Sequence, residues 1–281
     1  MVEALDRLLP REEPEASAAV AEVFEAEGIT ARVGQALTKV ESLERPGAIR
    51  LHFAPDEPVS VDRVLVAVGQ TAATDGLGLD AAGIETDVGG FIRTDAALRT
   101  TVRGIYAVGD IAGTVQFTHA ADEMGRIAAG NALRRTGRRR FDASLIPAVT
   151  YTIPEVARVG ITESEAVERG GRVAYVPMSE VDRAVVAGET RGFVKLIVGP
   201  RPVLRRLAGG RVLGATVVAP RAGEMIHEAV LAMRTRMFPA RLALTAHAYP
   251  TWSVAMQQAA AQLFVDVAGR RARPARPQQV A

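Results

Sequence analysis

The residues with the clearest potential for chemistry are Gly109 and Asp110, which follow a short apolar stretch from Ile105 to Val108. A helical pattern begins soon afterwards and covers residues 116–133. A carboxylate at the end of a strand can accept a hydrogen bond from a sugar hydroxyl, and a helix N-terminus offers free N–H groups to an anion. This arrangement is typical of one half of a dinucleotide site. The Gly-rich loop GxGxxG that usually forms the other half does not occur in the sequence.

The elements expected around this motif alternate between helix and strand. The periodicity predicts a helix from Pro10 to Gly28, paired strands over Ile29–Val40 and Ala48–Phe53, and a buried strand from Val61 to Val68. The first half of the chain therefore reads as an α/β arrangement.

The pattern changes at about Ser144. Four strands are predicted over 148–152, 172–177, 192–198 and 211–218, and two helices follow over 222–237 and 251–267. Strands that come first and helices that come afterwards indicate an α+β domain with an antiparallel sheet.

Composition narrows the range of functions. The chain of 281 residues has a formal net charge of +2, and it shows neither a long apolar run nor a signal-peptide pattern, so we expect a cytoplasmic protein without a membrane partner. Arginines cluster only at 134–140 and 270–276, which we interpret as a solvated helix end and a disordered tail rather than a nucleic-acid surface. No cysteine is present and the four histidines are scattered, so no disulfide, thiol nucleophile or metal site is expected.

Several longer segments resemble one family, in the family's order along the chain. TVRGIYAVGD from Thr101, with QFTHAA from Gln116, resembles the second flavin-binding motif of the FAD-dependent pyridine nucleotide–disulfide oxidoreductases. IPAVTYTIPEVARVG from Ile146 is similar to their dimerisation domain, and HAYPTWSVA from His247 to their terminal His-Pro-Thr segment. LLPREEPEAS from Leu8 is similar to part of their NAD(P) domain. The nearest branches are the dihydrolipoamide dehydrogenases and the mercuric reductases.

The resemblance implies partial doubly wound FAD and NAD(P) domains followed by an α+β dimerisation domain. The implied division is a partial NAD(P)-binding domain at 1–70, the C-terminal part of an FAD-binding domain at 71–143, the dimerisation domain at 144–268 and a disordered tail at 269–281. In the family, the first FAD loop and the redox-active Cys pair precede the matched region. The apolar segments 61–68 and 105–108 would then lack neighbouring strands and expose apolar faces.

The resemblance also assigns cofactor contacts. Gly109 and Asp110 match the position where the family's Asp hydrogen-bonds FAD, although an Asp after a strand can also cap a turn or helix. Four residues then match the helix start whose backbone amides face the flavin ring: Phe117, Thr118, His119 and Ala120. Glu3 matches an acid that binds the ribose of NAD, and the alternative is a solvated surface glutamate.

The family's catalytic acid–base pair is replaced in this chain. Alignment of the Pro250-Thr251 dipeptide places Tyr249 at the position of the catalytic His and Val254 at that of its Glu partner. A tyrosine with a pKa near 10 is a poor general base at neutral pH, which argues against dihydrolipoamide-type catalysis. His247 lies two residues before the required position.

Three functions remain open. The first is the C-terminal portion of an FAD- and NAD(P)H-dependent oxidoreductase, which is homodimeric through residues 144–268 and passes electrons through flavin to a disulfide or another acceptor, with a separate N-terminal chain as a further partner. The second is a non-catalytic dimerisation or scaffold fragment, and the third is an adenine-nucleotide or partner-binding module. Because half of the FAD site is absent, we expect the isolated chain to bind little flavin and to be inactive.

Overall fold

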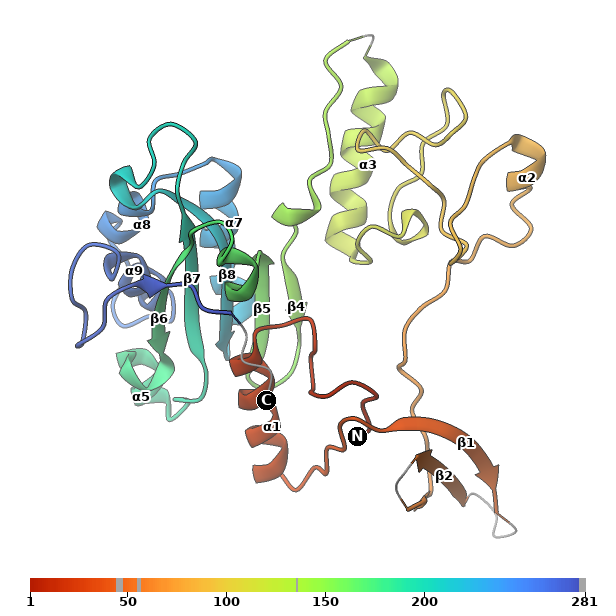
Figure 1. Ribbon diagram of the computed structural model, residues 1–281, viewed down its shortest axis with the longest axis horizontal. Coiled ribbons are helices and arrows are strands. Elements are labelled where there is room, and N and C mark those ends of the chain that lie inside the picture. Colours follow the sequence, from red (N-terminus) through yellow and green to blue (C-terminus); the bar gives the residue numbers. More distant parts are fainter. Residues whose placement is uncertain (44–47, 55–56, 135, 278–281) are drawn as a thin grey trace. The chain divides into compact units, whose positions relative to one another are not determined.

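The computed structural model describes residues 1–43, 48–54, 57–134 and 136–277 (Figure 1). The chain forms two compact units. The first unit combines Met1–Leu65 with Pro147–Ala281, and the second unit is Val66–Ile146. The four-part division expected from the sequence stays a prediction. None of the helices in the described ranges is long and apolar enough to span a membrane.

The centre of the first unit is a six-stranded antiparallel sheet with the strand order β4-β5-β8-β7-β6-β9. Its strands are β4 (Ala148–Thr150), β5 (Glu155–Gly160), β6 (Arg172–Pro177), β7 (Phe193–Gly199), β8 (Arg211–Ala219) and β9 (Arg273–Pro274). The antiparallel C-terminal sheet predicted from the sequence is confirmed, although β5 was not anticipated. β9 lies within the tail that was expected to be disordered, and it pairs with β6.

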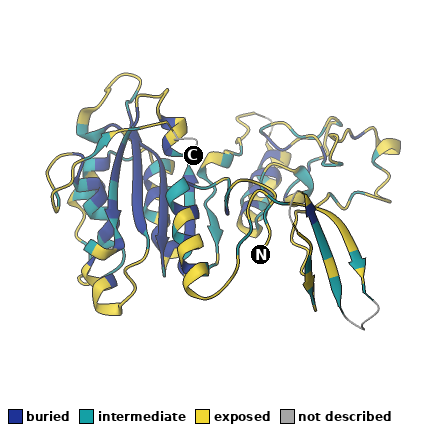
Figure 2. Ribbon diagram, turned by 60° about the horizontal axis from the view of Figure 1, so that its bottom comes forward, coloured by how far each residue is buried: buried dark blue, intermediate teal, exposed yellow. Residues whose placement is uncertain are grey.

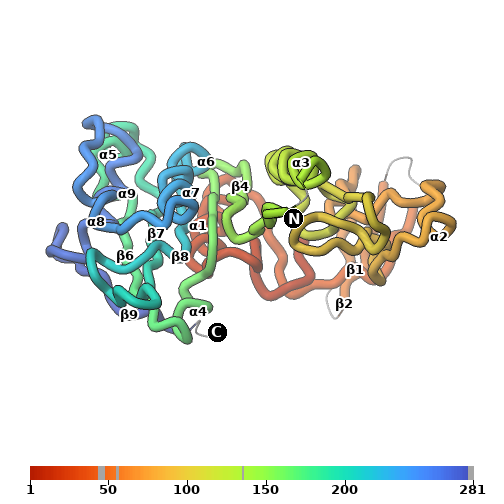
Figure 3. Tube along the Cα trace, turned by 90° about the horizontal axis from the view of Figure 1, so that it is seen from above, coloured from red at the N-terminus to blue at the C-terminus, as the bar shows by residue number. Residues whose placement is uncertain are grey.

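Helices cover one face of this sheet. They are α6 (Ala222–Met225), α7 (His227–Arg234), α8 (Pro239–Leu244) and α9 (Val254–Ala261), shorter than the two long helices expected. Their buried side chains, such as Ile226 and Ala259, pack with Leu196 and Val217 of the central strands in the main core. Figure 2 shows the central strands as buried, and Figure 3 shows α7 next to β8.

Helix α1 (Pro14–Ala26) packs on the other face of the sheet. Ala16 and Val20 contact an apolar row formed by Val156, Phe193 and Val218, one residue from each of three adjacent strands. The segment that precedes the first strands is therefore part of the same unit as the antiparallel sheet. Both faces of β7 are covered, which explains why all seven of its residues are buried.

A second, three-stranded sheet consists of β1 (Ala36–Ser42), β2 (Ile49–Ala54) and β3 (Val59–Val61), paired antiparallel in that order. The predicted strand pair is confirmed, and its predicted turn at 45–47 lies outside the described residues. The expected buried strand Val61–Val68 is wrong. Beyond Val61 the chain is not in a strand, and Leu65 and Val68 are 91% and 92% exposed. No described strand pairs with residues 62–68, so the apolar side chains of Leu65 and Val68 are uncovered.

The second unit is built around α3 (Thr118–Leu133) and also contains α2 (Leu79–Ala82). Met124 and Ile127 of α3 pack against Leu98 and Tyr106. The strand expected over 105–108 is reduced to a single bridge between Arg99 and Tyr106, again because no parallel neighbour is present among the described residues. The mixed α/β fold is confirmed, and among the described residues the only parallel pairing is the isolated bridge between Val2 and Arg32.

Candidate functional site

Gly109 adopts a conformation that only glycine accommodates well. Its φ is 76°, and a Cβ added there would lie 3.2 Å from the Cβ of Ala121 on α3. The Gly109 N–H donates to Sδ of Met124 at 3.2 Å, which ties the turn to the same helix. Asp110, which follows in the short 3-10 helix Asp110–Ala112, is exposed. Gly109 therefore packs on the early turns of α3, and the exposed Asp110 follows it directly in the chain.

The start of α3 has the features of an anion-accepting helix end. Phe117 is the N-cap residue and no side chain caps the first turn. The rings of Phe117 and His119 stack with their centroids 5.3 Å apart, Thr118 is exposed, and Ala120 is buried. The helix dipole places a partial positive charge at this end. An acceptor for hydroxyls and free N–H donors at a positive helix end are together the groups needed to hold one part of a flavin nucleotide.

Glu3 lies in the first unit, at the end of a short parallel bridge between Val2 and Arg32. Its N–H donates to the Arg32 carbonyl at 2.9 Å, and its Oε1 accepts from the Leu5 N–H at 2.9 Å. One carboxylate oxygen thus closes a local turn. The local hydrogen bond gives Glu3 a structural role, and its part in binding a ribose stays a prediction.

Tyr249 is 73% exposed, and its hydroxyl donates to Oδ2 of Asp182 at 2.8 Å. Asp182 is the first residue of α5 (Asp182–Ala187). This hydrogen bond and the negative charge of Asp182 raise the pKa of Tyr249 above its ordinary value. The tyrosine therefore stays protonated at neutral pH and can donate a hydrogen bond, but it cannot act as a general base.

His247 is held between two oxygens and does not take the place of the missing base. Its Nε2 lies 3.0 Å from Oε2 of Glu228, and its Nδ1 lies 2.9 Å from the Thr245 carbonyl oxygen. Burial lowers the pKa of His247, but the hydrogen bonds to Glu228 and Thr245 outweigh burial and raise the pKa above its ordinary value. Because both neighbours are acceptors, the doubly protonated imidazolium satisfies them best.

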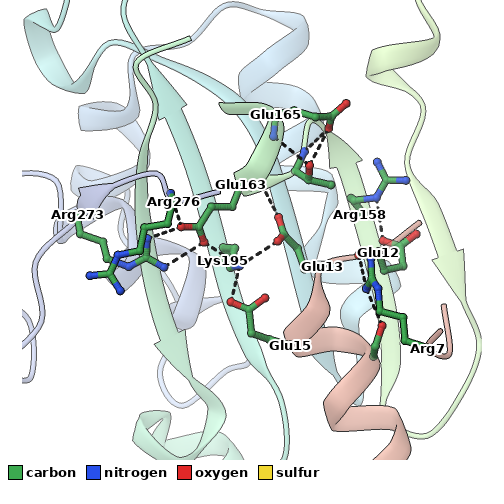
Figure 4. Close-up of polar contacts among 12 residues, drawn as sticks. Arg7, Glu12, Glu13, Glu15, Arg158, Glu163, Glu165, Lys195, Arg273 and Arg276 are labelled. Atoms are coloured by element: carbon green, nitrogen blue, oxygen red, sulfur yellow. Dashed lines mark hydrogen bonds and ion pairs between the residues drawn. The ribbon is translucent and has the colours of Figure 1, made fainter. Parts of the chain in front are cut away.

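The most extensive polar network of the first unit was not anticipated from the sequence. It is the charge cluster of Glu13, Glu15, Glu163, Lys195 and Arg273 (Figure 4). Lys195 is 1% exposed, and its Nζ lies 3.1 Å from Glu13, 2.7 Å from Glu15 and 3.0 Å from Glu163. Arg273 pairs with both oxygens of Glu163. The cluster joins α1 to β7, to β9 and to α4 (Glu163–Ala166).

Burial and charge act in opposite directions within this charge cluster. Burial alone would lower the pKa of Lys195, but the nearby carboxylates raise it above its ordinary value. Burial would raise the pKa of Glu163, but Arg273 and Lys195 hold it below its ordinary value. For Glu13 burial prevails over the attraction of Lys195, and its pKa is raised.

The charge cluster lines an open cleft of about 950 Å³, here called the mixed-charge cleft. Its charged lining consists of Arg7, Arg11, Arg158, Lys195, Arg273 and Arg276 together with Glu12, Glu13, Glu15, Glu163 and Glu165. Opposite charges are paired here, as in the contact of Arg158 Nε with Glu12 at 2.8 Å. The described residues hold no group of three or more His, Asp or Glu side chains placed to bind a metal ion.

Two family models match the chain over most of its length. Residues 1–125 match the model described as pyridine nucleotide-disulphide oxidoreductase, and residues 146–260 match the dimerisation domain of the same family. Similar curated proteins include the dihydrolipoyl dehydrogenases of Thermus scotoductus and Chlorobaculum tepidum, which are 35% and 38% identical over 94% and 92% of this chain. A mercuric reductase from Streptomyces lividans is 35% identical over 93% of it.

Solved structures agree with these matches. LpdA from Mycobacterium tuberculosis superimposes with a TM-score of 0.84 at 29% identity, and it covers 94% of this chain. The HOCl-induced flavoprotein disulfide reductase RclA from Escherichia coli reaches a TM-score of 0.80 at 28% identity over 91% of the chain. The chain spans only 54–56% of the length of the three curated relatives and 56–57% of the two solved chains. The chain, which contains no cysteine, belongs to the pyridine nucleotide-disulphide oxidoreductase family.

Proposed function

We propose that this chain is the C-terminal portion of a cytoplasmic FAD- and NAD(P)H-dependent oxidoreductase that forms a homodimer through residues 144–268. The observation that carries the proposal is that exposed Asp110 directly follows a turn that packs on α3, whose start has no side-chain cap, in a chain that matches both family models. A match to a dimerisation domain over residues 146–260 supports the homodimer. The large apolar side chains Leu231 and Leu244 are exposed in this region and are available to an interface.

The residues divide between two cofactor contacts. In the second unit, Asp110 accepts a hydrogen bond from a hydroxyl of FAD, and the first turn of α3 at residues 117–120 directs its N–H groups at the flavin. In the first unit, Glu3 accepts a ribose hydroxyl of the nicotinamide cofactor through the oxygen that does not bind Leu5. Bound FAD would supply electron transfer between nicotinamide and the acceptor.

The chain does not supply the whole reaction. It has no cysteine to form a redox-active disulfide, and the hydrogen bond to Asp182 keeps Tyr249 protonated. Without a Gly-rich loop it also lacks the usual group for holding the FAD pyrophosphate. A polypeptide segment that carries this loop would complete the site, and the isolated chain of 281 residues is expected to be inactive.

The test is a titration of the purified chain with FAD, followed by the quenching of flavin fluorescence. We expect weak binding that Asp110→Ala reduces at least tenfold, because the hydroxyl loses its charged acceptor. Asp122→Ala is the matched control, since Asp122 is an exposed carboxylate of α3 that pairs only with Arg126 among the described residues. Equal binding by wild type and Asp110→Ala would overturn the assigned flavin contact. A preparation that is yellow as purified would overturn the expectation of weak binding.

The second candidate function is a non-catalytic dimerisation scaffold. It is favoured by a specific contrast: the sheet of the first unit is covered on both faces, whereas Leu65, Val66 and Val68 near the unit boundary are exposed. Analytical ultracentrifugation of wild type and Leu244→Arg measures the dimer independently of flavin. A dimer that the variant dissociates, combined with flavin binding indifferent to Asp110→Ala, would favour the scaffold.

A further inference from the structure

The second unit contains a cleft of about 860 Å³ that differs in position and in charge from the flavin segment, by which we mean Asp110 and residues 117–120. We call it the basic cleft. It is formed by a loop at residues 93–95, a turn at residues 99–106 and the chain at the C-terminal end of α3. Its charged lining consists of Arg93, Asp95, Arg99, Arg103, Arg134 and Arg138. Five guanidinium groups and one carboxylate therefore line the basic cleft.

The walls of the basic cleft are fixed by a buried amide. Asn131 is 1% exposed, and its Nδ2 donates to the carbonyl oxygens of Ala97 at 3.2 Å and Arg139 at 2.8 Å. Its Oδ1 accepts from the Arg139 N–H at 2.8 Å, and the Phe141 N–H donates to the Ala96 carbonyl oxygen at 2.8 Å. These bonds hold the loop, the end of α3 and the chain that follows it in fixed positions. The backbone segments that carry the arginines are therefore hydrogen-bonded to one another.

Asp95, the carboxylate among the described lining residues, is already paired with Arg99. Asp95 Oδ2 accepts from Arg99 Nε at 2.8 Å, while Asp95 Oδ1 accepts from the backbone N–H groups of Ala97 and Arg99. Burial alone would raise the pKa of Asp95, but the Arg99 guanidinium and these N–H groups hold it below its ordinary value. The carboxylate is therefore ionised at neutral pH, and both of its oxygens already accept hydrogen bonds from within the protein.

The remaining arginines have no carboxylate among the lining residues. Arg93 Nε donates to the Thr86 carbonyl oxygen at 3.2 Å, and Arg134 Nη1 donates to the Gly137 carbonyl oxygen at 3.1 Å. Bonds to carbonyls orient these groups without cancelling their charge. The C-terminal end of α3 offsets only about half a unit charge. A concave wall with a net charge of +4 concentrates positive potential and attracts anions.

The size and donor set of the basic cleft indicate the class of ligand. Guanidinium groups bind phosphate oxygens through paired N–H donors, and several of them from different segments can surround a multiply charged group. A volume of about 860 Å³ lies in the range of small-molecule sites. The cleft lies at the C-terminal end of α3, whose 16 residues separate it by about 24 Å from the flavin segment at the N-terminal end.

We propose that the basic cleft binds a small polyanion with two or more phosphate groups. The proposal goes beyond the flavin assignment and uses none of its residues. Arg103 and Arg138 come from different segments, and neither side chain forms a hydrogen bond to another described residue, so both are available to a ligand.

Isothermal titration of the full chain with inorganic pyrophosphate tests the proposal. We expect one ion per chain, affinity that falls as salt rises, and at least a tenfold loss in the double variant Arg103→Gln/Arg138→Gln. Arg191→Gln is the matched control, because Arg191 is an exposed arginine of the first unit outside both clefts. Circular dichroism of each variant verifies that the fold is retained.

Four results would overturn the proposal. The first is no pyrophosphate binding by the wild type, and the second is an equal loss in Arg191→Gln, which would indicate unspecific attraction to the net charge. The third is a single-stranded oligonucleotide that binds more tightly with the same arginine dependence, which would make the cleft part of a nucleic-acid surface. The fourth is a loss of pyrophosphate binding in Asp110→Ala, which would place the ion at the proposed flavin contacts instead. This variant therefore separates the proposal from the proposed function.

Discussion

The mixed-charge cleft and the basic cleft have similar volumes and five arginines each, but they differ in their carboxylates. Five glutamates face the cations of the mixed-charge cleft, whereas Asp95 is the only acid among the described residues that line the basic cleft. In the first, the charges pair with one another and hold α1 on the sheet through Lys195. In the basic cleft, most of the positive charge has no carboxylate partner among the lining residues. The number of arginines alone therefore does not indicate whether a cleft serves the fold or a ligand, because the nearby carboxylates decide it.

The largest effect expected from this comparison is on stability, at the centre of the charge cluster. Lys195→Met removes the ammonium group and leaves the carboxylates of Glu13 and Glu163 buried. Breaking a buried ion pair in this way costs about 3–5 kcal/mol. Urea denaturation followed by circular dichroism should show a loss of this size in the free energy of unfolding.

The chain provides a matched control for Lys195→Met. Lys39 is its only other lysine, and it lies exposed on β1 beside Glu41, so Lys39→Met should leave stability unchanged within error. The double variant Lys195→Met/Glu13→Gln should recover part of the loss, because one unpaired carboxylate is removed. Equal stability of the two lysine variants would show that the charge cluster does not hold α1 in place.

The sequence predicted the antiparallel sheet well because its signal is local. The apolar residues of β6, β7 and β8 follow one another in short runs that fit buried strands, and the structure has these strands within one or two residues of the prediction. β5 was missed because Glu155 and Arg158 interrupt its apolar pattern. Their partners, Gly223 and Glu12, are distant in sequence, so only the folded chain explains these charges.

The candidate site could be predicted only where it rests on a local motif. Gly109, Asp110 and the start of α3 lie within a dozen residues, and the turn was expected from their types. Lys195 was missed because its carboxylate partner Glu13 is 182 residues away. The one local signal was a lysine inside the apolar run FVKLIVG, which already calls for a buried counter-charge. The segment 61–68 shows the reverse error, since its apolar pattern fits a buried strand whose neighbours are not among the described residues.

An intermediate, pH-dependent effect is expected at a pair that is partly exposed. The folded-state pKa of His247 is raised above the ordinary value of about 6.5, so its contact with Glu228 stabilises the fold fully below that value. The contribution is lost as pH rises through the higher folded-state pKa. Glu228→Gln should therefore lower the free energy of unfolding by about 0.5–1 kcal/mol near pH 6 and by less near pH 9.

Denaturation at the two pH values distinguishes this charge effect from a packing effect. Glu224→Gln serves as the control, because the exposed Glu224 side chain forms no hydrogen bond or ion pair with another described residue. Its effect should be small and the same at both pH values. A cost for Glu228→Gln that does not vary with pH would mean that His247 is neutral in the folded protein.

The smallest effect on stability is expected in the basic cleft, and its sign is the sharpest test of the comparison. Arg103→Gln/Arg138→Gln removes two like charges that no carboxylate of the cleft neutralises. Stability should stay within about 0.5 kcal/mol of wild type. It should rise slightly at low salt, where repulsion among the arginines is least screened. Thermal denaturation at low and at physiological salt measures this change in stability.

A clear loss of stability would mean that these arginines stabilise the fold, as Lys195 does, and are not available to a ligand. A charge that serves a ligand should cost affinity when it is removed, whereas a charge that serves the fold should cost stability.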